Sequence, residues 1–153
     1  MARYLITGIA GFIGSSLART LIAQGHSVRG MDNLSSGKTE NLDDIADRID
    51  FRKADILDAE AACDACRGID FVLHQAAIPS VVGSIEDPMT SHRVNADGTV
   101  NVLLAARYAR VQRVVYASSC AAYGDAQLPN HEAARPQPLS PYAVSKLAGE
   151  MYM

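Results

Sequence analysis

The sequence lacks several features that would place it in a specialised class of protein. No apolar run approaches the roughly twenty residues needed to span a bilayer, so we expect no membrane partner. The net charge is −3, and this mild acidity does not indicate the basic surface that binds nucleic acid. No internal repeat, low-complexity tract or long linker is present. With 153 residues, 48% of them hydrophobic, the chain can build the core of an ordinary globular domain.

Cysteine is scarce, and the residues that commonly bind metals are scattered. The three cysteines fit a reducing compartment. Cys63 and Cys66 have the spacing of a redox or zinc pair, but no second pair completes a metal site. They also fall inside a predicted helix instead of at a strand-to-helix turn. We therefore interpret the pair as inert and expect no metal site.

Strand and helix patterns alternate along the whole chain. The sequence predicts strands at 3–7, 27–31, 49–54, 69–74 and 111–118, and helices at 13–24, 59–66, 88–110 and 141–153. Such alternation predicts an α/β fold, a Rossmann-type doubly wound parallel sheet, with residues 1–153 forming one domain. The first strand begins without a preceding signal peptide, which indicates a cytoplasmic protein.

A glycine-rich turn joins the first predicted strand to the first helix. Gly8 permits a tight turn, Gly11 lets the backbone approach a pyrophosphate, and Gly14 lets the helix pack closely on the sheet. Asp32 ends the second strand near the expected distance of about twenty residues, where it can bind a ribose 2′-OH and repel a 2′-phosphate. This pattern favours NAD, and Lys38 leaves NADP as an alternative.

Tyr142 and Lys146 lie four residues apart in the last predicted helix. This spacing puts both side chains on one face, about one turn apart. A lysine ammonium near a phenol favours the ionised phenol, which is a base usable near neutral pH. Ser118 and Ser119 follow the fifth strand, whose carboxyl end should meet the same rim of the sheet.

With these motifs the chain resembles the extended short-chain dehydrogenases/reductases. It is most similar to the NAD-dependent nucleotide-sugar epimerases of the UDP-glucose and UDP-N-acetylglucosamine 4-epimerase kind. The motifs that carry the resemblance are those at 7–14, 32–34, 55–56, 74–77, 95–101, 118–124 and 138–146. They cover the chain from end to end.

The resemblance implies roles that spacing alone does not give. It implies catalytic roles for Ser119, Tyr142 and Lys146. The cofactor-binding set that it implies, together with the glycine motif, is Gly8, Gly11, Phe12, Ile13, Gly14, Asp32, Asn33, Asp55, Ile56, Gln75, Ala76, Ala77, Asn95, Ser118, Tyr142 and Lys146. Four of these have simpler interpretations. Asp55 could cap the following turn, the alanines at 76 and 77 could be tight packing, and Asn95 could be a surface polar residue.

The implied reaction is epimerisation at C4 of a UDP-sugar through a 4-keto intermediate. A 4,6-dehydratase is disfavoured, because Cys120 and Ala121 stand where that class commonly has an acidic pair. A nucleotide-sugar reductase stays open as an alternative. A redox sensor on this fold is disfavoured, because such sensors commonly lose the tyrosine–lysine pair.

Length provides the main rival interpretation. Members of the family that the chain resembles are about twice as long and carry a C-terminal substrate domain. We therefore expect that domain to be absent, and a truncated NAD-binding module without catalytic activity is the alternative to an active enzyme. The resemblance also implies a homodimer of the full-length chain, formed through the helices at 88–110 and from 141 onward.

Overall fold

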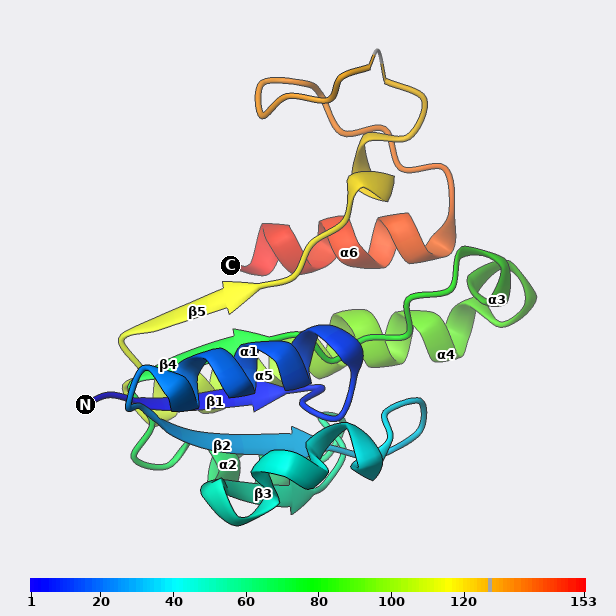
Figure 1. Cartoon of the computed structure of the whole chain (residues 1–153). Coiled ribbons are helices and arrows are strands. Elements are labelled where there is room, and N and C mark those ends of the chain that lie inside the picture. Colours follow the sequence, from blue (N-terminus) through cyan, green and yellow to red (C-terminus); the bar gives the residue numbers. More distant parts are fainter. Residues whose placement is uncertain (127) are drawn as a thin grey trace.

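The computed structural model describes residues 1–126 and 128–153. At its centre is a five-stranded sheet in which all neighbouring strands are parallel, in the order β3-β2-β1-β4-β5 (Figure 1). The strands are β1 (Arg3–Thr7), β2 (Ser27–Asp32), β3 (Ile49–Lys53), β4 (Phe71–His74) and β5 (Arg113–Tyr116). The order reverses between β1 and β4, and in open parallel sheets ligands bind outside the strand ends at such a switch point. The predicted fold class is confirmed.

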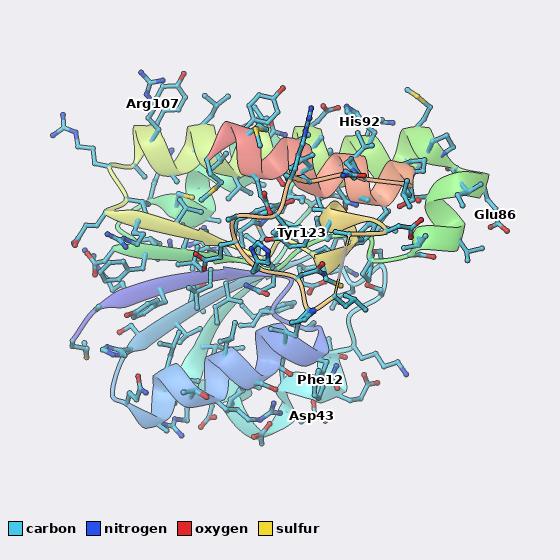
Figure 2. The ribbon with its side chains drawn as sticks, turned by 90° about the horizontal axis from the view of Figure 1, so that it is seen from above. Phe12, Asp43, Glu86, His92, Arg107 and Tyr123 are labelled. Atoms are coloured by element: carbon cyan, nitrogen blue, oxygen red, sulfur yellow. The ribbon has the colours of Figure 1, made fainter. Side chains whose placement is uncertain are left out.

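Helices cover both faces of this sheet. They are α1 (Phe12–Ala23), η1 (Thr39–Arg48), α2 (Ala59–Cys66), α3 (Val81–Glu86), α4 (Pro88–His92), η2 (Arg93–Asp97), α5 (Gly98–Tyr108), η3 (Cys120–Tyr123) and α6 (Pro141–Tyr152). Seen from above, α1 lies on one side of the sheet, and α5 and α6 lie side by side on the other (Figure 2). None of the helices within the described ranges has the length and apolar character needed to cross a membrane.

Two hydrophobic clusters hold the layers together. Leu5 and Ile6 are neighbours on β1, and both are fully buried. Because alternate side chains of a strand point to opposite faces, the two residues pack on opposite sides of the sheet. Leu5 packs in the cluster beneath α2 and α5, while Ile6 packs in the cluster beneath α1 and η1. A central strand that is apolar on both faces is typical of a parallel sheet covered by helices on each side.

The predicted helical stretch at 88–110 is confirmed from Pro88 to Tyr108. It consists of α4, the π-helical turn η2 and α5 in unbroken succession, and the π turn had not been predicted. Asn95 lies in that turn with its side chain buried, and it bonds the backbone of Ile78 and the hydroxyl of Ser145. A π turn inserts one residue into a helix and re-aims the side chains around it. Burial also rules out Asn95 as a surface polar residue.

Candidate cofactor and catalytic site

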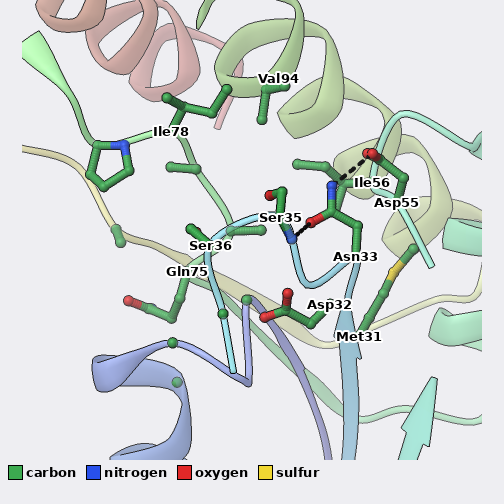
Figure 3. Close-up of a pocket in the computed structure, with 18 of the residues that line it drawn as sticks. Met31, Asp32, Asn33, Ser35, Ser36, Asp55, Ile56, Gln75, Ile78 and Val94 are labelled. Atoms are coloured by element: carbon green, nitrogen blue, oxygen red, sulfur yellow. Dashed lines mark hydrogen bonds between the residues drawn. The ribbon is translucent and has the colours of Figure 1, made fainter. Parts of the chain in front are cut away.

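A cavity of about 720 Å³ lies over the carboxyl ends of the strands. It extends from the glycine turn and β2 to α6, and Figure 3 shows the part of its lining around Asp32, Asn33 and Asp55. The predicted residues that line it are Gly8, Gly11, Phe12, Ile13, Gly14, Asp32, Asn33, Asp55, Ile56, Gln75, Ala76, Ala77, Ser118, Tyr142 and Lys146. Ser119 and Asn95 are not among the lining residues. The topology therefore brings most of the predicted set into one cavity.

Two glycines of the turn stand where a side chain would not fit. Gly8 has φ +71°, and a Cβ there would lie 2.8 Å from the backbone nitrogen of Ala76. A Cβ on Gly14 would lie 2.7 Å from Cα of Ile9, so α1 could not pack as closely on the turn. Gly11 is the N-cap of α1 and has no side chain with which to occupy the N–H groups of the first turn. Residues of that first turn line the cavity, and the positive end of a helix dipole stabilises an anion.

Asp32 ties the end of β2 to the glycine turn. One carboxylate oxygen accepts from the backbone N–H of Ala10 at 2.9 Å, and the other accepts from the N–H of Leu34 at 2.8 Å. The side chain is buried but lines the cavity. Each carboxylate oxygen has a second lone pair, so Asp32 keeps acceptor capacity for a ligand hydroxyl while it holds the loop.

Asn33 and Asp55 meet across the ends of β2 and β3. The amide of Asn33 donates to one carboxylate oxygen of Asp55 at 2.8 Å (Figure 3). The other oxygen of Asp55 accepts from the N–H of Leu57 at 2.9 Å. Asp55 therefore does cap the turn that follows it, and it also lines the cavity. Its contact with an adenine stays a prediction.

Tyr142 and Lys146 lie on successive turns of α6 and both face the cavity. The helix begins at Pro141, and the Ser140 hydroxyl caps it by accepting from the N–H of Ala143 at 3.1 Å. Lys146 is 3% exposed, and its ammonium donates to the carbonyl of Ala117 at 2.8 Å. Burial lowers the pKa of Lys146 to about 8. Both side chains line the cavity, as their four-residue spacing predicts.

The two serines after β5 differ in their surroundings. Ser118 lines the cavity, and its hydroxyl donates to the carboxylate of Glu150 on α6. Ser119 is the N-cap of η3, and its hydroxyl accepts from the N–H of Ala121 at 3.2 Å. The hydroxyl of Ser119 is thus occupied in capping a short turn at the margin of the cavity. Its catalytic role stays a prediction.

Several residues of the site had not been assigned from the sequence. Those that line the cavity are Met31, Ser35, Ser36, Gly37, Ala54, Leu57, Ile78, Pro79, Thr90, Val94 and Ala117. The sequence offered one signal for the loop after β2, which is Gly37. In the structure, a Cβ on Gly37 would lie 2.8 Å from Cβ of Ala10. A glycine shortly after Asp32 indicates such a close approach. Ile78 and Val94 come from segments that meet only in the folded chain.

A buried histidine beneath the site was also missed. His74 ends β4 and contacts the hydroxyls of Thr7 and Thr99 at 2.6 and 3.0 Å. Burial, and the nearby charge of Lys146, lower its pKa to about 3, so the ring is neutral. Its position in a motif after an apolar strand could have drawn attention to it, but its partners are distant in the sequence.

The described residues form no group of three or more side chains suited to hold a metal ion. Cys66 is buried, which raises the pKa of its thiol to about 11, so the reactive thiolate is disfavoured.

The strand order, the glycine turn and the buried tyrosine–lysine pair together define a dinucleotide-binding domain of the short-chain dehydrogenase/reductase class. The chain belongs, more narrowly, to the NAD dependent epimerase/dehydratase family, whose sequence profile matches residues 4–153. This membership confirms the resemblance drawn from the motifs.

Similar proteins agree in sequence and in structure. The chain is 45% identical over 156 residues to a UDP-glucose 4-epimerase of Mycolicibacterium smegmatis, covering 99% of this chain and 50% of the relative. A UDP-glucose 4-epimerase of Thermus thermophilus, solved with NAD, matches with a TM-score of 0.91 at 41% identity over 98% of this chain and 49% of that one. A UDP-N-acetylglucosamine 4-epimerase of Methanobrevibacter ruminantium, in complex with UDP-N-acetylmuramic acid, gives 0.93 at 35% identity, covering 99% and 49%. The chain spans about half the length of the curated relatives it matches.

Proposed function

We propose that the chain is the NAD-binding half of an epimerase that inverts C4 of a UDP-sugar through a 4-keto intermediate. One observation carries the proposal. A single cavity joins the glycine turn and Asp32 at one end to Tyr142 and Lys146 at the other. The similarity to the named 4-epimerases supports the choice of reaction and of substrate class.

The residues of the cavity fit NAD. Its volume of about 720 Å³ falls in the range of small-molecule sites, about 300 to 1,000 Å³. The first turn of α1 would bind the pyrophosphate, and Asp32 would accept hydrogen bonds from the adenosine ribose. The carboxylate would repel a 2′-phosphate, which favours NAD over NADP. Asn33 and Asp55 would border the adenine, and Asn95 would act indirectly by holding Ile78 in the cavity wall.

Proton transfer would fall to Tyr142. As a phenolate it would accept the proton of the sugar 4-hydroxyl during oxidation and return it during reduction. Lys146 would favour the phenolate by its charge, and Ser119 would share the hydrogen bond to the reacting oxygen. NAD, when bound, supplies the hydride acceptor and donor for the adjacent carbon.

The second candidate is a NAD-binding module without turnover. The chain spans about half the length of its curated relatives, so turnover by a whole protein of this family need not extend to it. Dehydration is a weaker candidate, because Cys120 and Ala121 offer no acid and base pair after Ser119.

The test uses the 153-residue chain with NAD and UDP-galactose. Isothermal titration measures NAD binding, and chromatography of the nucleotide sugars measures conversion to UDP-glucose. Binding and conversion, with conversion lost in Tyr142→Phe, support the epimerase. Binding without conversion supports the module. Failure to bind NAD, or full turnover by Tyr142→Phe, contradicts the proposed function.

We further propose a homodimer of the full-length chain, formed through α5 and α6. A shallow cavity of about 280 Å³ lies between these helices, lined by apolar side chains that include Leu103 and Tyr152. Tyr108 and Met151 on the same two helices are each 74% exposed. Large apolar side chains gathered on an open face mark an interaction site, and a twofold pair is the common arrangement. A monomer in light scattering at high protein concentration would contradict this proposal.

A further inference from the structure

The ammonium of Lys146 has few partners for a buried charge. It donates to the carbonyl of Ala117, but a lysine has three N–H donors. Within residues 1–126 and 128–153, no acidic side chain forms an ion pair with it. Burial disfavours the charged form, and a group that attracts the ammonium would offset part of that cost.

The aromatic ring of Tyr116 lies against this ammonium. Nζ of Lys146 is 4.8 Å from the centre of the ring. A cation within about 6 Å of the ring centre is attracted to the electron-rich face. Tyr116 precedes Ala117 in the chain, so one short segment at the end of β5 supplies both contacts to the ammonium.

The fold leaves room for this ring and fixes it in place. A Cβ on Gly149 would lie 2.9 Å from Cε1 of Tyr116, so only glycine at this position of α6 admits the ring. The phenol donates to the carbonyl of Lys146 at 3.4 Å, which links β5 to α6. On β4, the ring of His74 lies 5.7 Å away between centres, at an interplanar angle of 32°.

The other titratable groups around the contact are few. His74 on β4 is neutral, because burial lowers its pKa to about 3. Tyr116 itself stays a neutral phenol, because burial raises its pKa to about 12. Tyr142 and Glu150 approach from α6, and the carboxylate of Glu150 is bound to the hydroxyl of Ser118.

We propose that Tyr116 is a positioning residue, whose ring face holds the Lys146 ammonium at the cavity and favours its charged form. Its consequence for catalysis rests on the proposed function, since a charged lysine is what activates Tyr142. The contact itself is a property of the fold. It can therefore be tested without turnover.

The experiment measures the pKa of Lys146 by NMR of protein labelled at the lysine side chains. The chain has three lysines, and Lys38 and Lys53 are exposed, so they act as internal references. The variant Lys146→Arg assigns the third signal. Tyr116→Phe keeps the ring and should leave the pKa of Lys146 unchanged. Tyr116→Leu removes the ring face and should lower that pKa by about 0.5 to 1.

A second variant covers the case in which Tyr116→Leu does not fold. It carries an aromatic ring of nearly the same shape whose face attracts a cation more weakly. Pentafluorophenylalanine at 116 should lower the pKa of Lys146 relative to Tyr116→Phe. An unchanged pKa in either folded variant overturns the proposal. An equal lowering in Tyr116→Phe also overturns it, because the hydroxyl would then be responsible. A chain that fails to turn over UDP-sugars but shows the expected pKa changes contradicts only the proposed function.

Discussion

Thr7 and His74 meet at the carboxyl ends of the two central strands, with the threonine hydroxyl 2.6 Å from Nδ1 of the imidazole. On the other side of the ring, Nε2 lies 3.0 Å from the hydroxyl of Thr99. Thr99 donates its own proton to the carbonyl of Asn95 at 2.6 Å, so it must accept from His74. The proton of the neutral ring is therefore on Nε2, and Nδ1 accepts from Thr7.

Replacing His74 should destabilise the fold through these hydroxyls. In His74→Leu the Thr7 hydroxyl loses its acceptor and Thr99 loses its donor, and both are fully buried. We expect a loss of about 1 to 3 kcal/mol in the free energy of unfolding, measured with urea. His74→Gln should lose less, because an amide can replace one bond. The exposed His131→Gln is the control and should change little. Equal stability of the leucine variant and the wild type would contradict the role of this network.

His74 should also make stability depend on pH. Its pKa is lowered to about 3 in the folded chain, so below pH 6.5 the unfolded chain binds a proton that the folded chain does not. Stability should therefore fall as the pH drops from 6.5 toward 3, by about 1.4 kcal/mol per pH unit. Urea titrations of wild type and His74→Gln between pH 4 and 7 compare the two slopes.

That window is chosen to separate the histidine from the carboxylates. Hydrogen bonds from Arg29 and from the N–H of Arg3 lower the pKa of Asp50 and Asp70, so their contributions are lost at lower pH. The difference between the two proteins isolates His74. Parallel slopes between pH 4 and 6.5 would show that the ring is not buried and neutral.

Gly14→Ala should weaken NAD binding. The added Cβ would collide with the backbone of Gly8 and Ile9, so the turn must open and its N–H groups must move. We expect NAD to bind at least about tenfold more weakly, which corresponds to about 1.4 kcal/mol, in isothermal titration. Gly25→Asn is the matched control, because a Cβ there meets no atom within 4 Å and asparagine tolerates its positive φ. Equal losses in both variants would indicate general destabilisation.

Asp32→Asn should change the preference between the two nicotinamide cofactors. The amide nitrogen cannot accept from the N–H groups of Ala10 or Leu34, and the charge that repels a 2′-phosphate is gone. We expect the ratio of NAD to NADP affinity to fall by about tenfold or more. The exposed Asp43→Asn on η1 provides the control. An unchanged ratio in the Asp32 variant would show that this carboxylate holds the loop but does not select between the two cofactors.

The parts of the fold that local pattern determines could be predicted from the sequence. The run Tyr4-Leu5-Ile6 predicts a buried strand, and the glycines at 8, 11 and 14 predict the turn that follows it. The predicted fifth strand, 111–118, is longer than the observed Arg113–Tyr116. Arg110 adopts φ +57° ahead of this strand, a conformation that propensity does not predict for arginine.

The remainder depends on contacts between distant residues. The π turn at Arg93–Asp97 is not visible in the apolar periodicity of 88–110, because its partners Ile78 and Ser145 lie elsewhere in the chain. The environment of Lys146 is likewise set by Tyr116, thirty positions earlier. Residues Thr39–Arg48 form a 3₁₀ stretch for which no helix had been predicted.

The π turn has a consequence for motion in the site. The side chain of Asn95 accepts from the N–H of Ile78 and donates to its carbonyl, and the same amide nitrogen also donates to the hydroxyl of Ser145 on α6. The hydroxyl of Ser145 in turn donates to the carbonyl of Tyr142 at 2.8 Å. Any shift of α6 along its axis must move the segment at Ile78 with it or break these hydrogen bonds. The cavity wall at Ile78 and the helix that carries Tyr142 should therefore move together.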